Sequence, residues 1–346
     1  MSYLDFFRLQ TEPFGNAPNE RFYYNSAQHA RALTRIMYVA ETMKGLAAVV
    51  GDIGTGKTTL ARKVLDSLPD EAYESALLII LHAEISPEWL LRKIAGQLGV
   101  EQPGRDKIQI IGQLYRRLLH LHQMGKKAVV LIDEAQMFNS RQLMEEFRGL
   151  LNLEVTAHKL ITFIFFGLPE LEQNLALDPP LLQRVAMKIR LSTLSEETTK
   201  AYIIHRLAIA GNREEVFTDS ALARIYSCSG GFPRKINILC DNALFQGFLM
   251  RRRTVDAAIV DEMALDLGFA PQVVLEPAMP SVDLSSDRGT GDAAVSLAGG
   301  LPHNPTEENP AYNGVEISPG PAGEDPDEDD IEARFDEFFK ETFEGG

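Results

Sequence analysis

The stretch that decides the fold is Gly51-Asp52-Ile53-Gly54-Thr55-Gly56-Lys57-Thr58, which matches the pattern G-x-x-x-x-G-K-[ST] in full. The apolar run 46–50 precedes it, and apolar residues recur at helical spacing through 60–68 after it. A buried strand, a glycine loop and a helix in this order are typical of a phosphate-binding loop. The flanking pattern separates this segment from a glycine turn that carries Lys-Thr by chance.

Each residue type in this loop has a physical task. Glycines let the backbone turn tightly, so that successive N–H groups and the positive end of the following helix face the phosphates. Lys57 supplies a point charge for the β- and γ-phosphates, and the Thr58 hydroxyl is a ligand for Mg²⁺. The predicted nucleotide-binding residues are Gly51, Asp52, Ile53, Gly54, Thr55, Gly56, Lys57, Thr58 and Thr59, the last as an α-phosphate contact.

A second motif follows the apolar run 128–132, where Asp133 and Glu134 stand side by side. Ligands bind beyond the carboxyl ends of parallel strands, so two acids at such a strand end lie in the crevice where the phosphates bind. We expect Asp133 to hold the Mg²⁺ ion and Glu134 to position or deprotonate the attacking water. A loop of the type Asn-Lys-x-Asp, which reads guanine, is absent from the sequence, and ATP is therefore the predicted nucleotide.

Strand and helix patterns alternate through the first half of the chain, which predicts an α/β fold with a doubly wound parallel sheet. The expected strands are 46–50, 76–81, 128–132 and 160–166. From residue 194 onward only helical patterns remain. The predicted domains are a nucleotide-binding α/β domain (1–192), an α-helical lid (193–268), a disordered acidic linker (269–330) and an amphipathic docking helix (331–344).

The net charge of −15 belongs to the tail, because residues 269–346 carry 18 Asp/Glu and 3 Lys/Arg and the remainder is neutral. A neutral body argues against a protein that coats nucleic acid through bulk charge. Two cysteines without metal-ligand spacing favour a reducing compartment. The N-terminus shows no signal peptide, and no apolar stretch is long enough to span a membrane, so a cytoplasmic location without membrane insertion is expected.

Several further motifs make the resemblance specific. They are Phe6-Phe7, Pro13-Phe14, Phe22-Tyr23-Tyr24, Ile132-Asp133-Glu134-Ala135-Gln136, Gly167-Leu168-Pro169-Glu170-Leu171, Leu194-Ser195-Glu196-Glu197-Thr198, Tyr202, His205-Arg206-Leu207, Gly211 and Gly231-Phe232-Pro233-Arg234-Lys235-Ile236-Asn237. With the glycine loop, these residues resemble the ExeA/GspA-type AAA+ ATPases of bacterial secretion, pilus assembly and exopolysaccharide loci, from Tyr3 to about Leu267.

The resemblance implies an AAA+ P-loop ATPase that forms a nucleotide-dependent homo-oligomer. It implies that Arg234 is the lid arginine that reaches the γ-phosphate in its own subunit. Arg184 becomes the candidate arginine finger, which acts on a neighbour's nucleotide and makes hydrolysis depend on oligomerisation. The alternative for either arginine is a structural role, such as a surface ion pair.

Two departures from the family matter. The family often carries Gln where this chain has Leu168, and a leucine side chain cannot hydrogen-bond water or phosphate. Another polar group then substitutes for it, or hydrolysis is slow. Longer members continue into a membrane span and a peptidoglycan-binding domain, whereas this chain continues into an acidic tail, so cell-wall binding is not carried over.

Five apolar residues of the tail share one helix face, at the spacing i, i+4, i+7, i+8 and i+12. They are Ile331, Phe335, Phe338, Phe339 and Phe343. Such a face predicts docking into a groove of a partner, a protein component of a secretion or pilus machine that recruits the chain to the inner membrane. The alternative is that the segment folds back on its own chain.

Three functions remain open at this point. The first is a motor or switch for the assembly of a secretion, pilus or polysaccharide-export system. The second is a DNA-acting regulator of the transposition-helper type, which the neutral body charge disfavours. The third is a slow-hydrolysing, nucleotide-gated adaptor, which Leu168 keeps in view.

Overall fold

A computed structural model describes residues 2–17, 19–82, 84–155 and 158–269, and it confirms the predicted parallel sheet. The predicted linker beyond residue 269 and the amphipathic segment 331–344 lie outside the described residues. Five strands pair in the order β2-β3-β6-β1-β7, and every pair is parallel. They are β1 (Leu46–Gly51), β2 (Tyr73–Ile79), β3 (Lys127–Asp133), β6 (Ile161–Gly167) and β7 (Val185–Leu191).

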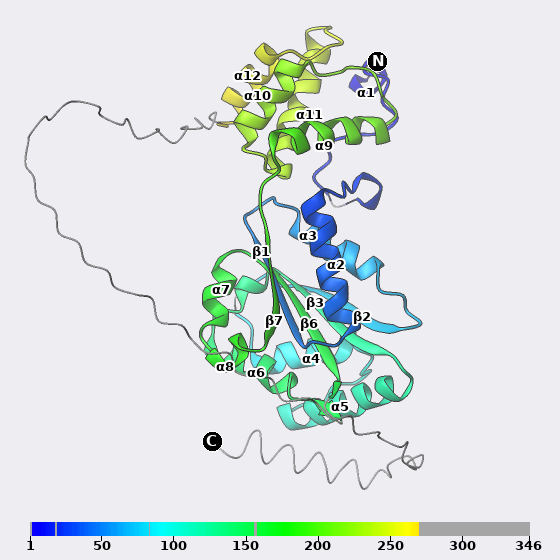
Figure 1. Cartoon of the computed structure of the whole chain (residues 1–346), viewed down its shortest axis with the longest axis vertical. Coiled ribbons are helices and arrows are strands. Elements are labelled where there is room, and N and C mark those ends of the chain that lie inside the picture. Colours follow the sequence, from blue (N-terminus) through cyan, green and yellow to red (C-terminus); the bar gives the residue numbers. More distant parts are fainter. Residues whose placement is uncertain (1, 18, 83, 156–157, 270–346) are drawn as a thin grey trace, which may run out of the picture. The chain divides into compact units, whose positions relative to one another are not determined.

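Helices cover both faces of this sheet, as the side-chain alternation along β6 shows. Ile164 and Phe166 pack in one buried cluster with α2 (Ala27–Glu41) and α3 (Lys57–Asp66). Phe163 and Phe165 point to the other face and contact the ring of Phe147 in α6 (Arg141–Leu150) at 5.2 and 4.8 Å. Strand β1 lies between β6 and β7 (Figure 1), and it is buried along its whole length, so the glycine loop starts at an interior strand of the sheet.

The remaining elements of the sheet region are short or peripheral. They are η1 (Glu20–Phe22), α4 (Pro87–Gln97), α5 (Lys107–Gln123), η2 (Ala135–Met137), the hairpin β4 (Glu154–Val155) and β5 (His158–Lys159), α7 (Glu170–Leu175) and α8 (Pro179–Leu182). Helix α5 packs on β3, and α4 packs on α5 and α6. Within the described part of the chain, no helix is long and apolar enough to cross a membrane.

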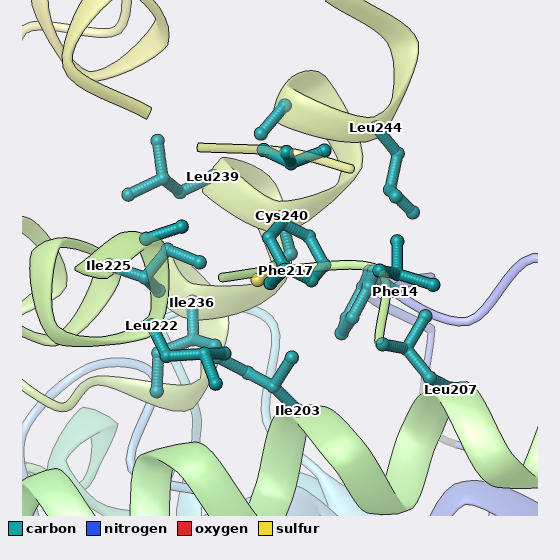
Figure 2. Close-up of a cluster of buried hydrophobic side chains, with 14 of the residues drawn as sticks. Phe14, Ile203, Leu207, Phe217, Leu222, Ile225, Ile236, Leu239, Cys240 and Leu244 are labelled. Carbon is teal, nitrogen blue, oxygen red and sulfur yellow. The ribbon is translucent and has the colours of Figure 1, made fainter. Parts of the chain in front are cut away.

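Four helices follow the last strand and form what we call the helical group: α9 (Glu196–Ile209), α10 (Asp219–Ser229), α11 (Pro233–Leu249) and α12 (Ala257–Asp266). Their buried faces share one apolar cluster, in which Cys240, Phe217 and the leucines and isoleucines of three helices meet (Figure 2). All four helices were expected from the sequence. Both cysteines are buried and unpaired, as apolar core residues.

The N-terminal segment packs into the core of this helical group, which the sequence did not reveal. Phe6, Phe7, Phe14 and Phe22 belong to the same buried cluster as α9–α12, and Phe14 lies 6.3 Å from the ring of Phe217. Helix α1 (Tyr3–Phe6) contacts α11. The predicted boundaries grouped these residues with the nucleotide-binding sheet, but their apolar surface is buried by the helices that end the described chain.

The sequence also missed the edge strand β7 and the small hairpin β4–β5. On β7, only Ile189 and Leu191 are buried, while Lys188 and Arg190 face solvent. This half-polar alternation is typical of an edge strand and gives a weaker signal than the continuous apolar runs of central strands.

The packing of the N-terminal segment yields a stability prediction. We expect Phe14→Ala to lower the free energy of unfolding by about 3–5 kcal/mol, because it opens a cavity in a close-packed core. The side chain is only 2% exposed. Chemical denaturation followed by circular dichroism measures the change. The matched control is Leu265→Ala in α12, whose side chain is 81% exposed and whose loss should cost at most about 0.5 kcal/mol. Equal effects of the two changes would show that the segment is not part of this core.

Candidate functional site

The glycine loop runs from the end of β1 to the start of α3, and its three glycines lie where no side chain fits. A Cβ on Gly51 would lie 2.7 Å from the Leu191 carbonyl oxygen. Gly54 and Gly56 have φ angles of +82° and +98°, in the left-handed region that glycine adopts without strain. The sequence therefore carries glycine here because of both backbone conformation and the close approach of other elements.

Two other parts of the chain fill the space beside the loop glycines. A Cβ on Gly54 would lie 2.8 Å from the Cβ atom of Arg234, at the start of α11. A Cβ on Gly56 would lie 2.9 Å from Nε2 of His29, in the first turn of α2. The loop is thus clamped between the helical group and the helix that precedes β1.

Lys57 is a buried cation at the mouth of this loop. Its Nζ donates to the carbonyl oxygens of Gly51 at 2.9 Å and Asp52 at 3.0 Å. Burial lowers the pKa of the ammonium group, and the carboxylates of Glu134 and Asp133 oppose that shift. An ammonium group has three donors, so two carbonyl contacts leave one hydrogen to point at an anion.

The two predicted magnesium ligands are in direct contact. Thr58 Oγ1 donates to Asp133 Oδ2 at 2.6 Å, and the backbone N–H of Glu134 donates to Asp133 Oδ1 at 3.0 Å. Asp133 is 1% exposed, and burial raises the pKa of its carboxyl group. Burial thus disfavours the ionised form of Asp133, and a cation beside the carboxylate would stabilise that form.

The donor set fits Mg²⁺ rather than a metal caged by protein. No group of three or more His, Cys, Asp or Glu side chains that could hold a metal occurs in the parts of the chain that the structure describes. A hydroxyl and one carboxylate are the contribution that a Mg²⁺ ion takes from protein when water and phosphate oxygens complete its shell. Thr58 and Asp133 therefore suit Mg²⁺ that arrives with a nucleotide.

Glu134 is held next to this pair by a residue that the sequence reasoning did not assign. Gln136 Nε2 donates to Glu134 Oε2 at 2.7 Å, and Gln136 Oε1 accepts the N–H of Leu168 at 3.0 Å. Glu134 itself has a positive φ of +58°, an uncommon conformation for a residue other than glycine. The signal was present in the stretch Asp133-Glu134-Ala135-Gln136, where a second polar residue follows the acids.

A cavity of about 370 Å³ joins these groups. It is lined by residues of the loop and Glu134, by residues 15–17, 19 and 22–24, and by Tyr202, Arg206 and Arg234 of the helical group. Leu168 also lines the cavity, so the position where the family often has a polar side chain is apolar here. A volume of this size with a polar phosphate end is sufficient for a nucleotide.

The structure brings together all the predicted site residues except Arg184. The backbone N–H of Arg234 lies 3.4 Å from the Gly54 carbonyl oxygen, and its side chain lines the cavity. Arg184 stands just before β7, whose first residue pairs with the first residue of β1. Arg184 therefore lies near the amino-terminal ends of these strands, about 20 Å from the loop, which lies at the carboxyl end of β1. Its guanidinium donates to the Arg148 carbonyl oxygen at 3.0 Å and to Asn152.

Arg206 is a second residue whose role the sequence did not show. It is 6% exposed, and its guanidinium donates to the carbonyl oxygens of Pro13 at 2.6 Å and Gly15 at 3.1 Å. It also bonds Tyr202 Oη and Asn237 Oδ1. Through these bonds Arg206 ties the N-terminal wall of the cavity to α9 and α11. The motif His205-Arg206-Leu207 marked the residue, but the partners are distant in the sequence.

Comparison with known proteins places this site in a family context. Residues 40–175 match the model of the AAA domain. General secretion pathway protein A of Aeromonas hydrophila is 36% identical over 251 residues, which cover 71% of this chain and 45% of that protein. An uncharacterized HTH-type transcriptional regulator of Methanocaldococcus jannaschii is 29% identical over 153 residues, or 42% and 36% of the two chains. The chain thus spans less than half the length of these relatives.

Solved structures share the fold at low sequence identity. The ORC2 protein of Aeropyrum pernix, in ADPNP-ADP complexes, aligns with a TM-score of 0.56 and 17% identity over 74% of this chain and 71% of that one. The Walker-type ATPase of Pyrococcus abyssi aligns with a TM-score of 0.52 and 16% identity over 74% and 76%. These similarities show the AAA fold alone.

The clamped loop yields a matched pair of glycine substitutions. Gly54→Ala should lower the free energy of unfolding by about 1–3 kcal/mol, because it combines a positive φ with a clash against Arg234. Gly96→Ala in α4 should raise it by about 0.5–1 kcal/mol, since nothing lies within 4 Å of the new Cβ and alanine favours helices. Chemical denaturation of the two variants measures both signs. A gain in stability for Gly54→Ala would contradict the contact between the loop and α11.

Proposed function

This chain belongs to the ExeA/GspA-type family of AAA+ ATPases, and on that basis we propose that it binds and hydrolyses ATP with Mg²⁺. We further propose that this activity drives or switches the assembly of a bacterial secretion, pilus or polysaccharide-export system through protein contacts. The observation that carries the ATPase proposal is the cluster of Lys57, the Thr58–Asp133 pair and Glu134 around one cavity. The 36% sequence identity to General secretion pathway protein A supports the assembly role.

The roles of the residues follow from their chemistry. A bound Mg²⁺ ion would neutralise charge on the β- and γ-phosphate oxygens, and Thr58 and Asp133 would hold it. Lys57 turns its free N–H toward the same oxygens. Glu134 would accept a proton from the attacking water molecule. The hydrogen bond from Gln136 to one carboxylate oxygen of Glu134 fixes the orientation of this side chain. Arg234 lies on the cavity wall, and its charge would act on the terminal phosphate of a bound nucleotide.

Slow turnover is the second candidate, and the apolar side chain of Leu168 favours it. The backbone N–H of Leu168 is used by Gln136, and its side chain offers the attacking water no hydrogen bond. In this variant of the proposal, ATP acts mainly as a switch that is reset slowly. Gln136 is then a polar group bonded to the backbone at the sensor position, and it acts through Glu134.

We propose the predicted division into a nucleotide-binding domain (1–192) and an α-helical lid (193–268). Strand β7 ends at Leu191 and α9 begins at Glu196, which supports a boundary between them. Phe6, Phe7, Phe14 and Phe22 pack in the core of the helical group, which supports placing the N-terminal segment with the lid. Arg234 lies on the lid and contacts the loop, so closure of the lid on a nucleotide is the conformational change that we expect to be coupled to ATP.

The partners proposed are a second copy of this chain and a protein of the assembled machine. Arg184 lies far from the cavity of its own chain, so an action on nucleotide would have to be directed at the cavity of a neighbouring subunit. We propose that the segment 331–344, outside the described residues, docks on the partner protein. DNA remains the disfavoured ligand because residues 1–268 carry no net charge.

Removal of the proposed base tests whether the chain hydrolyses ATP. Glu134→Gln should lower the steady-state rate of ATP hydrolysis by about 10²–10⁴-fold, the usual contribution of a general base. It should leave the affinity for Mg-ATP within about threefold of wild type, because Lys57, Thr58 and Asp133 are untouched. Calorimetric titration and phosphate release measure the two quantities. If wild type and Glu134→Gln both bind Mg-ATP and release phosphate at the same rate, the chain is a slow switch and Glu134 is not the base of an ATPase.

Mixing two inactive variants tests Arg184 as a residue supplied to a neighbour. We expect Arg184→Ala and Glu134→Gln to be inactive alone, and a one-to-one mixture to regain ATPase activity. In random mixed assemblies about one interface in four pairs an intact Glu134 with an intact Arg184. Phosphate release across the mixing ratio measures the recovery. If the phosphate-release rate of the mixture equals the mean of the two variants, Arg184 has only a structural role through its bonds to Arg148 and Asn152.

A further inference from the structure

His29 is a buried histidine that contacts the phosphate loop and has no part in the proposed chemistry. It is 7% exposed, and its Nε2 atom lies 3.2 Å from the carbonyl oxygen of Thr55, inside the loop. Its Nδ1 atom lies 2.7 Å from Oγ of Ser26, the residue that caps α2. Both ring nitrogens therefore have partners, and the ring is fixed between a helix cap and the loop.

The protonation of the ring follows from these partners. A carbonyl oxygen only accepts, so Nε2 carries a hydrogen and donates to Thr55. Burial lowers the pKa of the imidazole, so the ring is neutral at neutral pH and Nδ1 has no hydrogen. Ser26 Oγ accepts a hydrogen bond from the backbone N–H of His29 at 3.4 Å, and its hydroxyl donates a hydrogen bond to Nδ1. One tautomer, with the hydrogen on Nε2, satisfies every group.

The Thr55 carbonyl matters because of the peptide unit to which it belongs. In a trans peptide the C=O of Thr55 and the N–H of Gly56 point in opposite directions, and no cis bond occurs in the described chain. A carbonyl held by His29 therefore directs the Gly56 N–H away from the ring. The N–H groups at this helix start have no partner inside the helix and are the ones that bind phosphate.

Glycine at position 56 leaves this peptide free to rotate unless something holds it. Its φ of +98° belongs to a region in which glycine has little intrinsic preference. Inside the loop, the bonds of Thr55 Oγ1, Thr55 N and Lys57 Nζ all go to carbonyl oxygens of Gly51 or Asp52. Those bonds restrain the chain before Thr55. The bond from His29 is the restraint that acts on the peptide after it.

We propose that His29 is a positioning residue for the phosphate loop, which holds the Thr55–Gly56 peptide so that the Gly56 N–H faces the nucleotide phosphates. His29 then sets nucleotide affinity and leaves the chemical step to Glu134. The inference rests on the proposed function, because it presumes that the loop binds ATP. The first turn of α2 is itself anchored, since Gln28 bonds the backbone of Ser192 just beyond β7 at 2.9 and 3.2 Å.

The test compares three substitutions in the full chain. His29→Gln keeps an amide N–H near the position of Nε2, His29→Leu removes the donor, and His29→Asn is too short to reach Thr55. We expect the leucine and asparagine variants to raise both the Kd for Mg-ATP and the KM at least about tenfold, since a buried carbonyl loses its donor. The rate at saturating ATP should change by less than about threefold, and the glutamine variant should bind within about threefold of wild type.

A second readout needs no nucleotide. Nitrogen-15 NMR of the histidine ring in the nucleotide-free protein should show the neutral Nε2–H tautomer for His29 at neutral pH. This measurement on the wild-type chain stands even where a substitution impairs folding. A ring with the hydrogen on Nδ1 would overturn the proposal, as would glutamine and leucine variants that bind ATP equally well or are equally impaired.

Binding of Mg-ATP to the wild-type chain separates the proposed function from the role of His29. Binding of Mg-ATP to wild type, abolished by Lys57→Ala, upholds the proposed function. If the leucine variant then binds like wild type, the role of His29 alone is wrong. Failure of wild type to bind Mg-ATP would remove the proposed function and the role of His29 with it.

Discussion

Close backbone approach at three glycines is the constraint on which the site depends. Each glycine of the loop meets a different element where a Cβ would be: β7 at Gly51, α11 at Gly54 and α2 at Gly56. The loop is therefore not a free hairpin between a strand and a helix. Its shape is set by the edge of the sheet, by the helical group and by the helix before β1 together.

These contacts join the loop to two parts of the chain. Arg234 of α11 lines the cavity and also contacts Gly54, so the helical group touches the loop directly. His29 of α2 contacts Gly56, so the loop lies between a helix that packs on the sheet and a helix of the helical group.

Two buried ionic groups show the cost of keeping this site ready. Burial lowers the pKa of Lys57 and raises that of Asp133, so each is less stable in its charged form than it would be in water. Hydrogen bonds from Thr58 to Asp133 and from Lys57 to the loop carbonyls offset part of that cost, and so does the attraction between Lys57 and the nearby carboxylates. A bound nucleotide with its magnesium ion would add further countercharges, so we expect the protein to gain stability when it binds them.

The sequence predicted the elements whose signal is local. The loop and the acids after β3 lie where the sequence placed them, and the region from residue 194 onward is helical through α12, as expected. It did not predict β7, because polar residues interrupt the apolar residues of this strand, whereas the strands that were predicted show continuous apolar runs. Nor did it predict His29, Gln136 or Arg206, since their importance arises from partners that the fold brings close. Arg206 bonds the carbonyl oxygen of Pro13, which is 193 residues away.

The route of the N-terminal segment also bears on how such proteins evolve. Phe6, Phe7, Phe14 and Phe22 fill the core of helices that come almost two hundred residues later, and Arg206 bonds the backbone between them. The helical group is therefore not a cassette that recombination can exchange at a single junction. Exchange of these helices for a different set would leave Phe6, Phe7, Phe14 and Phe22 without their packing partners and would remove the bonds of Arg206 to the wall of the cavity.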